Sequence, residues 1–156
     1  MNEAQIATSV MMACFLLIAV LSRSSTYFVL AAAYTVNCAA HWVFESTPAW
    51  SSWWPALYST IDAAALIAIT EIGDIRKNAQ AWLLSALITM HALLAFDLVR
   101  DTSVVFVSYY HVVMAIIAIQ ATIGLWDAGR RFRRAGSASY SNCKFSNNGQ
   151  GYSKSH

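Results

Sequence analysis

Residues 79–98 read AQAWLLSALITMHALLAFDL, and this stretch decides the class of fold. Its single charged side chain, Asp97, stands next to its end, and it contains neither proline nor glycine. A helix needs about 17–25 mainly apolar residues to cross the hydrocarbon core of a bilayer. The stretch therefore predicts a transmembrane helix.

Further apolar runs of similar length lie on either side of this stretch, at residues 4–21, 27–44, 56–72 and 103–126. The run at 56–72 is the weakest, because it contains Asp62 and Glu71. The connections are short, so consecutive helices should pack antiparallel. We expect an all-α, polytopic transmembrane bundle of about five helices. Four crossing helices are the alternative, with 56–72 re-entrant or interfacial.

The overall composition agrees with a membrane protein. Hydrophobic residues make up 58% of the chain and charged residues 12%, whereas a soluble domain carries about 25% charged residues. The chain opens Met-Asn-Glu without a basic segment, so we interpret its first apolar run as a retained helix and not as a signal peptide. The three cysteines are irregularly spaced, which argues against a disulfide framework.

The basic residues predict an orientation, because Lys and Arg are retained on the cytoplasmic side. With five helices and the N-terminus outside, nine of the ten basic residues lie inside and only Arg100 lies outside. With four helices the N-terminus is inside and Arg23 also moves outside, so charge alone separates the two arrangements poorly. We expect the N-out, C-in arrangement in a cytoplasmic membrane.

The end of the chain has a different character. An arginine cluster is expected to anchor the topology and to touch anionic lipid; it comprises Arg130, Arg131, Arg133 and Arg134. Ser, Asn and Gly dominate the following segment, so we predict a bundle over 1–134 and a disordered cytoplasmic tail over 135–156. Four arginines alone are a weak signal for nucleic acid, and we expect none to bind.

Tryptophan side chains favour the boundary between membrane and water, where the ring is apolar and the N–H stays hydrated. All six are expected to be interfacial anchors: Trp42, Trp50, Trp53, Trp54, Trp82 and Trp126. The segment at 49–55 is expected to lie as a loop along the outer leaflet. A sharper alternative makes it a docking surface or a lid over a site.

Ionisable side chains inside a membrane are costly and are therefore candidate sites. Four of them, on four predicted helices, fall at one depth, roughly 5–12 Å below the outer boundary at 1.5 Å per residue; they are His41, Asp62, His91 and His111. Helical spacing gives them polar neighbours on their own helices, at Tyr34, Asn37, Tyr58 and Ser108.

Several chemical interpretations of this polar layer remain open. Three imidazoles and a carboxylate suit a divalent transition metal. His91 and His111, on consecutive helices, are the pair that we expect to face each other, and they suit a haem iron. The layer also suits a proton relay, and simple hydrogen bonding between helices remains the plainest explanation.

The sequence carries no P-loop, no dinucleotide-binding glycine motif and no GxSxG. Our first functional hypothesis is therefore a non-enzymatic accessory subunit or a self-associating, holin-like or pore-type protein, with itself or other membrane subunits as partners besides lipid. Stretches of small residues, such as Ala31 to Ala33, favour close helix packing and support it. The alternative is a metal- or haem-binding redox or proton-handling protein that uses the polar layer.

Overall fold

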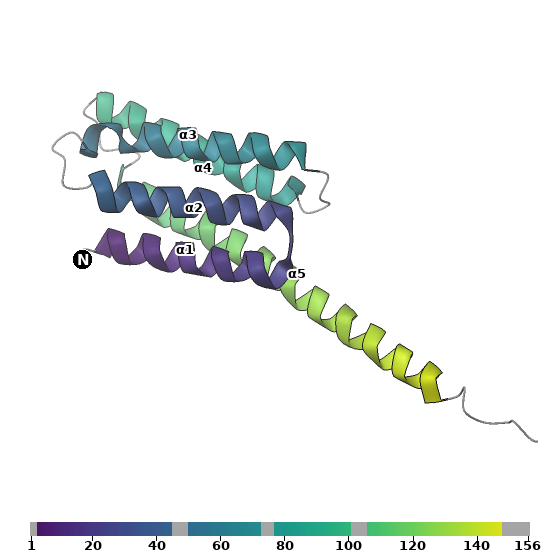
Figure 1. The fold of residues 1–156 in the computed structure, drawn as a ribbon. Coiled ribbons are helices and arrows are strands. Elements are labelled where there is room, and N and C mark those ends of the chain that lie inside the picture. Colours follow the sequence, from purple (N-terminus) through teal and green to yellow (C-terminus); the bar gives the residue numbers. More distant parts are fainter. Residues whose placement is uncertain (1–2, 45–49, 73–76, 101–105, 148–156) are drawn as a thin grey trace, which may run out of the picture.

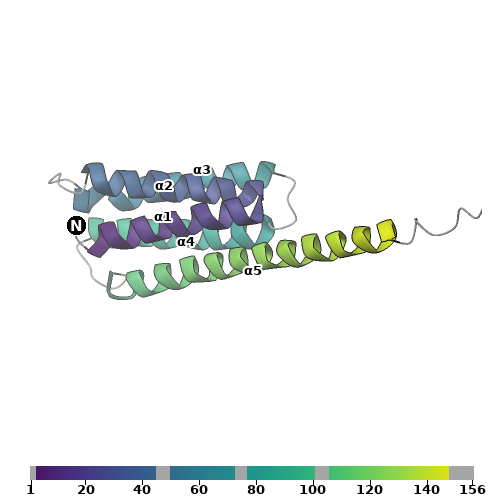
Figure 2. The same ribbon diagram turned by 60° about the horizontal axis from the view of Figure 1, so that its bottom comes forward.

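A computed structural model describes residues 3–44, 50–72, 77–100 and 106–147. Over these residues the chain is all-α (Figure 1), and its five helices are α1 (Glu3–Ser22), α2 (Ser25–Phe44), α3 (Trp50–Glu71), α4 (Lys77–Val99) and α5 (Phe106–Asn147). The helices lie side by side and alternate in direction (Figures 1 and 2). One end of the bundle therefore holds the starts of α1, α3 and α5, and we call it the N-terminal end. The opposite end holds Arg23 and the arginine cluster of α5, and we call it the basic end.

Four of the helices are long and apolar enough to cross a membrane, at Gln5–Ser22, Ser25–Phe44, Asn78–Val99 and Ser108–Ala135. These spans indicate a multi-pass membrane protein. Helix α3 does not reach the same hydropathy, because its 22 residues include Asp62, Glu71 and several hydroxyl side chains. It nevertheless packs against α4 and α2 as a full member of the bundle.

The connection between α1 and α2 is a tight turn built on backbone capping. Arg23 takes a left-handed backbone conformation with φ 47°, and its N–H donates to the carbonyl of Ala19 at 2.9 Å. This pattern ends a helix without leaving its last carbonyls unpaired. The carbonyl of Arg23 in turn accepts a bond from Arg131 Nη1 at 3.2 Å, which ties the basic end of α5 to the turn.

Close packing holds α5 against the first two helices. A Cβ added at Gly124 would lie 2.6 Å from Ile18 and 3.1 Å from Tyr27, so only glycine fits there without displacing a neighbour. Phe15 and Tyr34 stack nearby with ring centroids 4.3 Å apart. Some of the small residues are used in packing inside the bundle, where Ala31, Ala33, Ala40 and Ala65 are buried.

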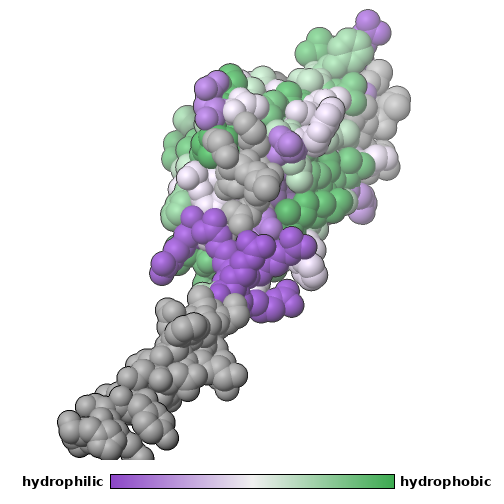
Figure 3. Space-filling model, turned by 90° about the vertical axis from the view of Figure 1, so that its right-hand side faces the viewer, coloured by the Kyte–Doolittle hydropathy of each residue, from purple (hydrophilic) through white to green (hydrophobic). Residues whose placement is uncertain are grey.

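The last helix continues beyond the boundary expected from the sequence. The sequence predicts a bundle over 1–134 and disorder from 135 onward, but α5 runs on to Asn147 and projects from the other helices (Figure 1). No proline interrupts this extension, so helical hydrogen bonding propagates past the arginines. Hydrophilic residues gather where the extension leaves the bundle (Figure 3), at the position of the exposed Arg130, Arg133 and Arg134. Residues 148–156 lie outside the described residues.

The tryptophan-rich segment is helical and is not a loop. Helix α3 begins at Trp50, so Trp53 and Trp54 stand on its first turns, and both are half-buried. Trp53 packs edge-on against Phe44 at 5.4 Å. Trp42, Trp82 and Trp126 are 49%, 77% and 56% exposed, and their role as interfacial anchors stays a prediction.

Candidate functional site

A cavity of about 350 Å³ lies in the N-terminal half of the bundle. All five helices contribute to its wall, from Ala7 on α1 to Ile117 on α5. Its polar and aromatic lining comprises Tyr34, Asn37, His41, Trp54, Tyr58, Asp62, His91, Tyr109 and Tyr110. Ligand-binding cavities typically measure about 300–1,000 Å³ and combine apolar walls with a few polar groups, as this one does.

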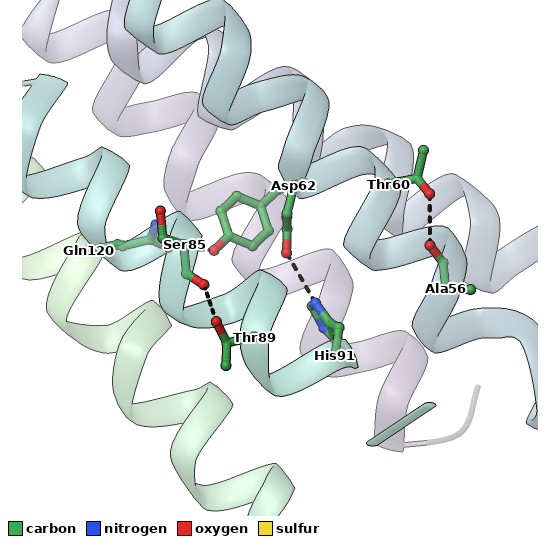
Figure 4. A network of polar contacts seen from close by, with 8 residues as sticks. Ala56, Thr60, Asp62, Ser85, Thr89, His91 and Gln120 are labelled. Atoms are coloured by element: carbon green, nitrogen blue, oxygen red, sulfur yellow. Dashed lines mark hydrogen bonds and ion pairs between the residues drawn. The ribbon is translucent and has the colours of Figure 1, made fainter. Parts of the chain in front are cut away.

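Asp62 and His91 form the polar centre of this cavity. Asp62 Oδ2 lies 3.2 Å from His91 Nδ1, and each side chain is 5% exposed. Figure 4 shows the two side chains pointing toward each other from α3 and α4. The distance is that of an ion pair, but neither atom makes a hydrogen bond of good geometry to the described residues. Each atom can therefore take a further polar partner.

Aromatic rings enclose His91. The centroids of Tyr58, Tyr109 and Trp54 lie 5.6, 5.8 and 6.5 Å from its ring. Trp54 also packs edge-on against Tyr58 at 5.3 Å and Tyr109 at 5.8 Å. Edge-to-face pairs at these separations are favourable, so the rings form a mutually supporting wall from α3, α4 and α5.

His41 and Asn37 bring the polar face of α2 to the same cavity. The ring of His41 lies 5.5 Å from that of Tyr58 in an edge-on arrangement. Asn37 is buried, and its Oδ1 accepts no hydrogen bond from the described residues. The predicted face of Tyr34, Asn37 and His41 therefore does point at one place, as the helical spacing of these residues indicates.

His111 does not join the other three members of the predicted layer. It is exposed on α5 and packs against the ring of Tyr110 at 5.9 Å. Its predicted helical neighbour Ser108 is exposed as well. Residues two apart on a helix point about 200° apart, so α5 presents Tyr109 to His91 where we expected His111. The expected facing pair of His91 and His111 is replaced by His91 and Asp62.

The metal and haem interpretations gain nothing from this arrangement. Among the described residues, no group of three or more His, Cys, Asp or Glu side chains is placed to hold a metal ion. His41, Asp62 and His91 share a cavity wall without converging on one point, so metal or haem binding stays a prediction.

Sequence reasoning identified Tyr34 and Tyr58 but missed the other aromatic residues of the site. Tyr109 and Tyr110 gave no separate signal, and Trp54 was counted among the interfacial anchors. The spacing of Trp54, Tyr58 and Asp62 at four-residue intervals places all three on one face of a helix. That spacing could have joined Trp54 to the polar layer.

Comparisons with protein families, with curated proteins and with solved structures found no match to this chain. Four of the described helices are candidate membrane spans, and they indicate a multi-pass helical membrane protein.

Proposed function

We propose that this protein binds a small organic cation inside the membrane, in the cavity beside Asp62. The observation that carries the proposal is the state of Asp62 Oδ2, which is buried in a residue of the cavity wall and accepts no hydrogen bond from the described residues. A buried carboxylate oxygen without a hydrogen-bond donor is costly. An ammonium or amidinium ligand would supply a donor.

The cavity wall supports the same class of ligand. The faces of Trp and Tyr rings attract cations, by about 0.5–1 kcal/mol at exposed sites and about 2 kcal/mol or more where water is excluded. Trp54, Tyr58 and Tyr109 surround the centre of the cavity, and Tyr34 and Tyr110 complete its lining. One carboxyl group among several rings suits a protonated amine, which offers both a positive charge and an N–H donor.

Isothermal titration calorimetry of the purified chain in detergent tests the proposal, with protonated N,N-dimethylbenzylamine as the probe. Isobutylbenzene has the same shape without the charge or the N–H donor and serves as the matched ligand control. We expect the cation to bind and the neutral analogue to bind at least tenfold more weakly, a difference of about 1.4 kcal/mol or more. Equal affinities would refute the role of the carboxylate.

Variants sharpen the same measurement. Asp62→Asn keeps the size of the side chain and removes the charge, so the affinity should fall at least tenfold. Glu71→Gln makes the same change at an exposed position near the other end of α3 and should leave affinity unchanged. Trp54→Leu should weaken binding, whereas Trp82→Leu, at a position that is 77% exposed, should not.

The location of the site within a membrane belongs to the proposal. Arg23, the start of α4 at Lys77 and the arginine cluster all belong to the basic end, which the distribution of positive charge predicts to be cytoplasmic. The cavity then lies in the outer half of a cytoplasmic membrane. Ligands would reach it from the outer face or from the outer leaflet.

Self-association is a second candidate function, and the outward face of α5 favours it. Small and polar side chains lie exposed along one stripe of this helix, at Ser108, His111, Ala115, Ala118 and Thr122. An imidazole directed at lipid is costly, and small residues allow helices to approach closely. Light scattering should show an oligomer for the native chain and a smaller species for Ala115→Leu. A monomeric native chain would exclude this candidate.

A further inference from the structure

A second polar feature runs lengthwise through the bundle, from the cavity to the basic end. Tyr34, in the cavity wall, donates its hydroxyl hydrogen to Gln120 Oε1 at 2.7 Å. Gln80 Nε2 lies 3.4 Å from both the carbonyl oxygen of Gln120 and the hydroxyl of Tyr27. Tyr27 donates to Asp127 Oδ2 at 2.9 Å. We call these five residues the polar track.

The track keeps register along two antiparallel helices. Tyr27 and Tyr34 are seven residues apart on α2, and Gln120 and Asp127 are seven apart on α5. Seven residues rise about 10.5 Å. The Tyr34–Gln120 and Tyr27–Asp127 contacts are therefore separated by the same height on both helices. From Tyr27 to His41 the polar groups on α2 extend over about 21 Å. This is most of the roughly 30 Å that separates the two faces of the hydrocarbon core.

Several atoms beside the track lack hydrogen-bond partners among the described residues. Gln80 and Gln120 are 0% exposed, yet Gln80 Oε1 and Gln120 Nε2 are unpaired there, as is Thr26 Oγ1. In the cavity wall, Asn37 Oδ1 also has no hydrogen-bond partner among the described residues. Each such atom loses the hydrogen bonds that it makes to water in the unfolded chain, so it is costly if it stays without a partner. Buried waters that make several hydrogen bonds are the usual remedy in sites lined by polar groups.

We propose that the polar track and the cavity form a hydrated path that conducts protons across the membrane. A proton enters from the cavity end and is held by the Asp62–His91 pair. It passes along waters bound to Tyr34, Gln120 and Gln80, and leaves through Asp127 to the solution at the basic end. One proton enters for each proton released, and no oxidation or reduction takes place.

The roles of the side chains differ along this path. The carboxyl groups and the imidazole can take up and release a proton, and chains of such groups mark proton relays in membrane proteins. Glutamine amides do not exchange protons readily at neutral pH, so Gln80 and Gln120 position water and do not carry the proton. Conduction needs no organic ligand and is independent of the proposed cation binding.

Proton flux into liposomes tests this inference. The full chain is reconstituted into liposomes that contain a pH-sensitive dye, and a potassium gradient with valinomycin drives protons inward. We expect internal acidification several-fold faster than in protein-free liposomes. Gln120→Leu and Tyr34→Phe should each lower the protein-dependent rate at least fivefold. Thr89→Val, which removes an exposed hydroxyl bonded within its own helix, should leave the rate unchanged.

The inference is wrong if the native chain acidifies liposomes no faster than occurs without protein. It is also wrong if folded Tyr34→Phe conducts protons as fast as the native chain. Because Gln120→Leu could fail to fold, Tyr34→Phe decides the matter, since it removes a single hydroxyl group. Cation affinity is measured in detergent without a gradient, so loss of one activity does not imply loss of the other.

Discussion

Asp62 Oδ2 and His91 Nδ1 lie 3.2 Å apart between α3 and α4, and both side chains are almost completely buried. Among the described helices, α3 alone is not a candidate span, and the pair joins it to α4, which is one. It also lies where rings from three helices meet. Packing and chemistry therefore depend on the same two side chains.

Removing one partner of this pair should destabilise the bundle. His91→Leu leaves a carboxyl group buried without its partner, and loss of one member of a buried pair costs about 3–5 kcal/mol. The double variant with Asp62→Leu should recover much of that loss, because no uncompensated polar group remains. Thermal unfolding in detergent measures both. The control variant is His111→Leu, which alters an exposed imidazole. Measured on monomeric protein, it should change the free energy of unfolding by less than about 0.5 kcal/mol.

Glycine at position 124 should be essential for the contact between α1 and α5. Gly124→Val places side-chain atoms where Ile18 and Tyr27 already stand, and such overpacking costs about 1–3 kcal/mol. Gly129→Ala meets nothing within 4 Å on the same helix and should be neutral or slightly stabilising. The apparent Tm in detergent compares the two. Equal shifts would mean that α5 does not pack as described.

The two ends of the chain should label on opposite sides of the membrane. In a variant with Cys14→Ala and Cys38→Ala, the native Cys143 reports on the tail, and Asn2→Cys reports on the start in a separate variant without Cys143. We expect an impermeant maleimide to label position 2 in intact cells and Cys143 only after lysis, because positive charge is retained inside. Protection of both positions would favour four crossings with the N-terminus inside.

The arginine cluster should determine this orientation. Replacing Arg130, Arg131, Arg133 and Arg134 with Gln removes four of the basic residues expected inside. Mixed labelling of Cys143 in intact cells, or poor insertion, is the expected result. A chain that ends after Ala135 retains the cluster and should keep its orientation. If truncation rather than neutralisation scrambles the topology, the tail and not the arginine charge directs insertion.

The sequence by itself determined the class of fold. Long apolar runs without compensating charge can be satisfied only by helices with internally paired backbones in lipid. The sequence also identified Asp62, His91 and His41 as candidate site residues, because an ionisable side chain within an apolar run is costly in a membrane. Spacing along α2 also placed Tyr34, Asn37 and His41 on one face.

Only the tertiary structure decided which groups meet. The rotation of α5 about its axis turns Tyr109 inward and His111 outward, and no pattern within that helix distinguishes the two. Helix α3 joins the bundle despite its lower hydropathy, because it packs against α2 and α4 and buries Asp62 inside the bundle. The polar track joins Tyr27 to Asp127, one hundred residues apart. Such a contact depends on the relative rotation and height of whole helices, which packing sets and local sequence does not record.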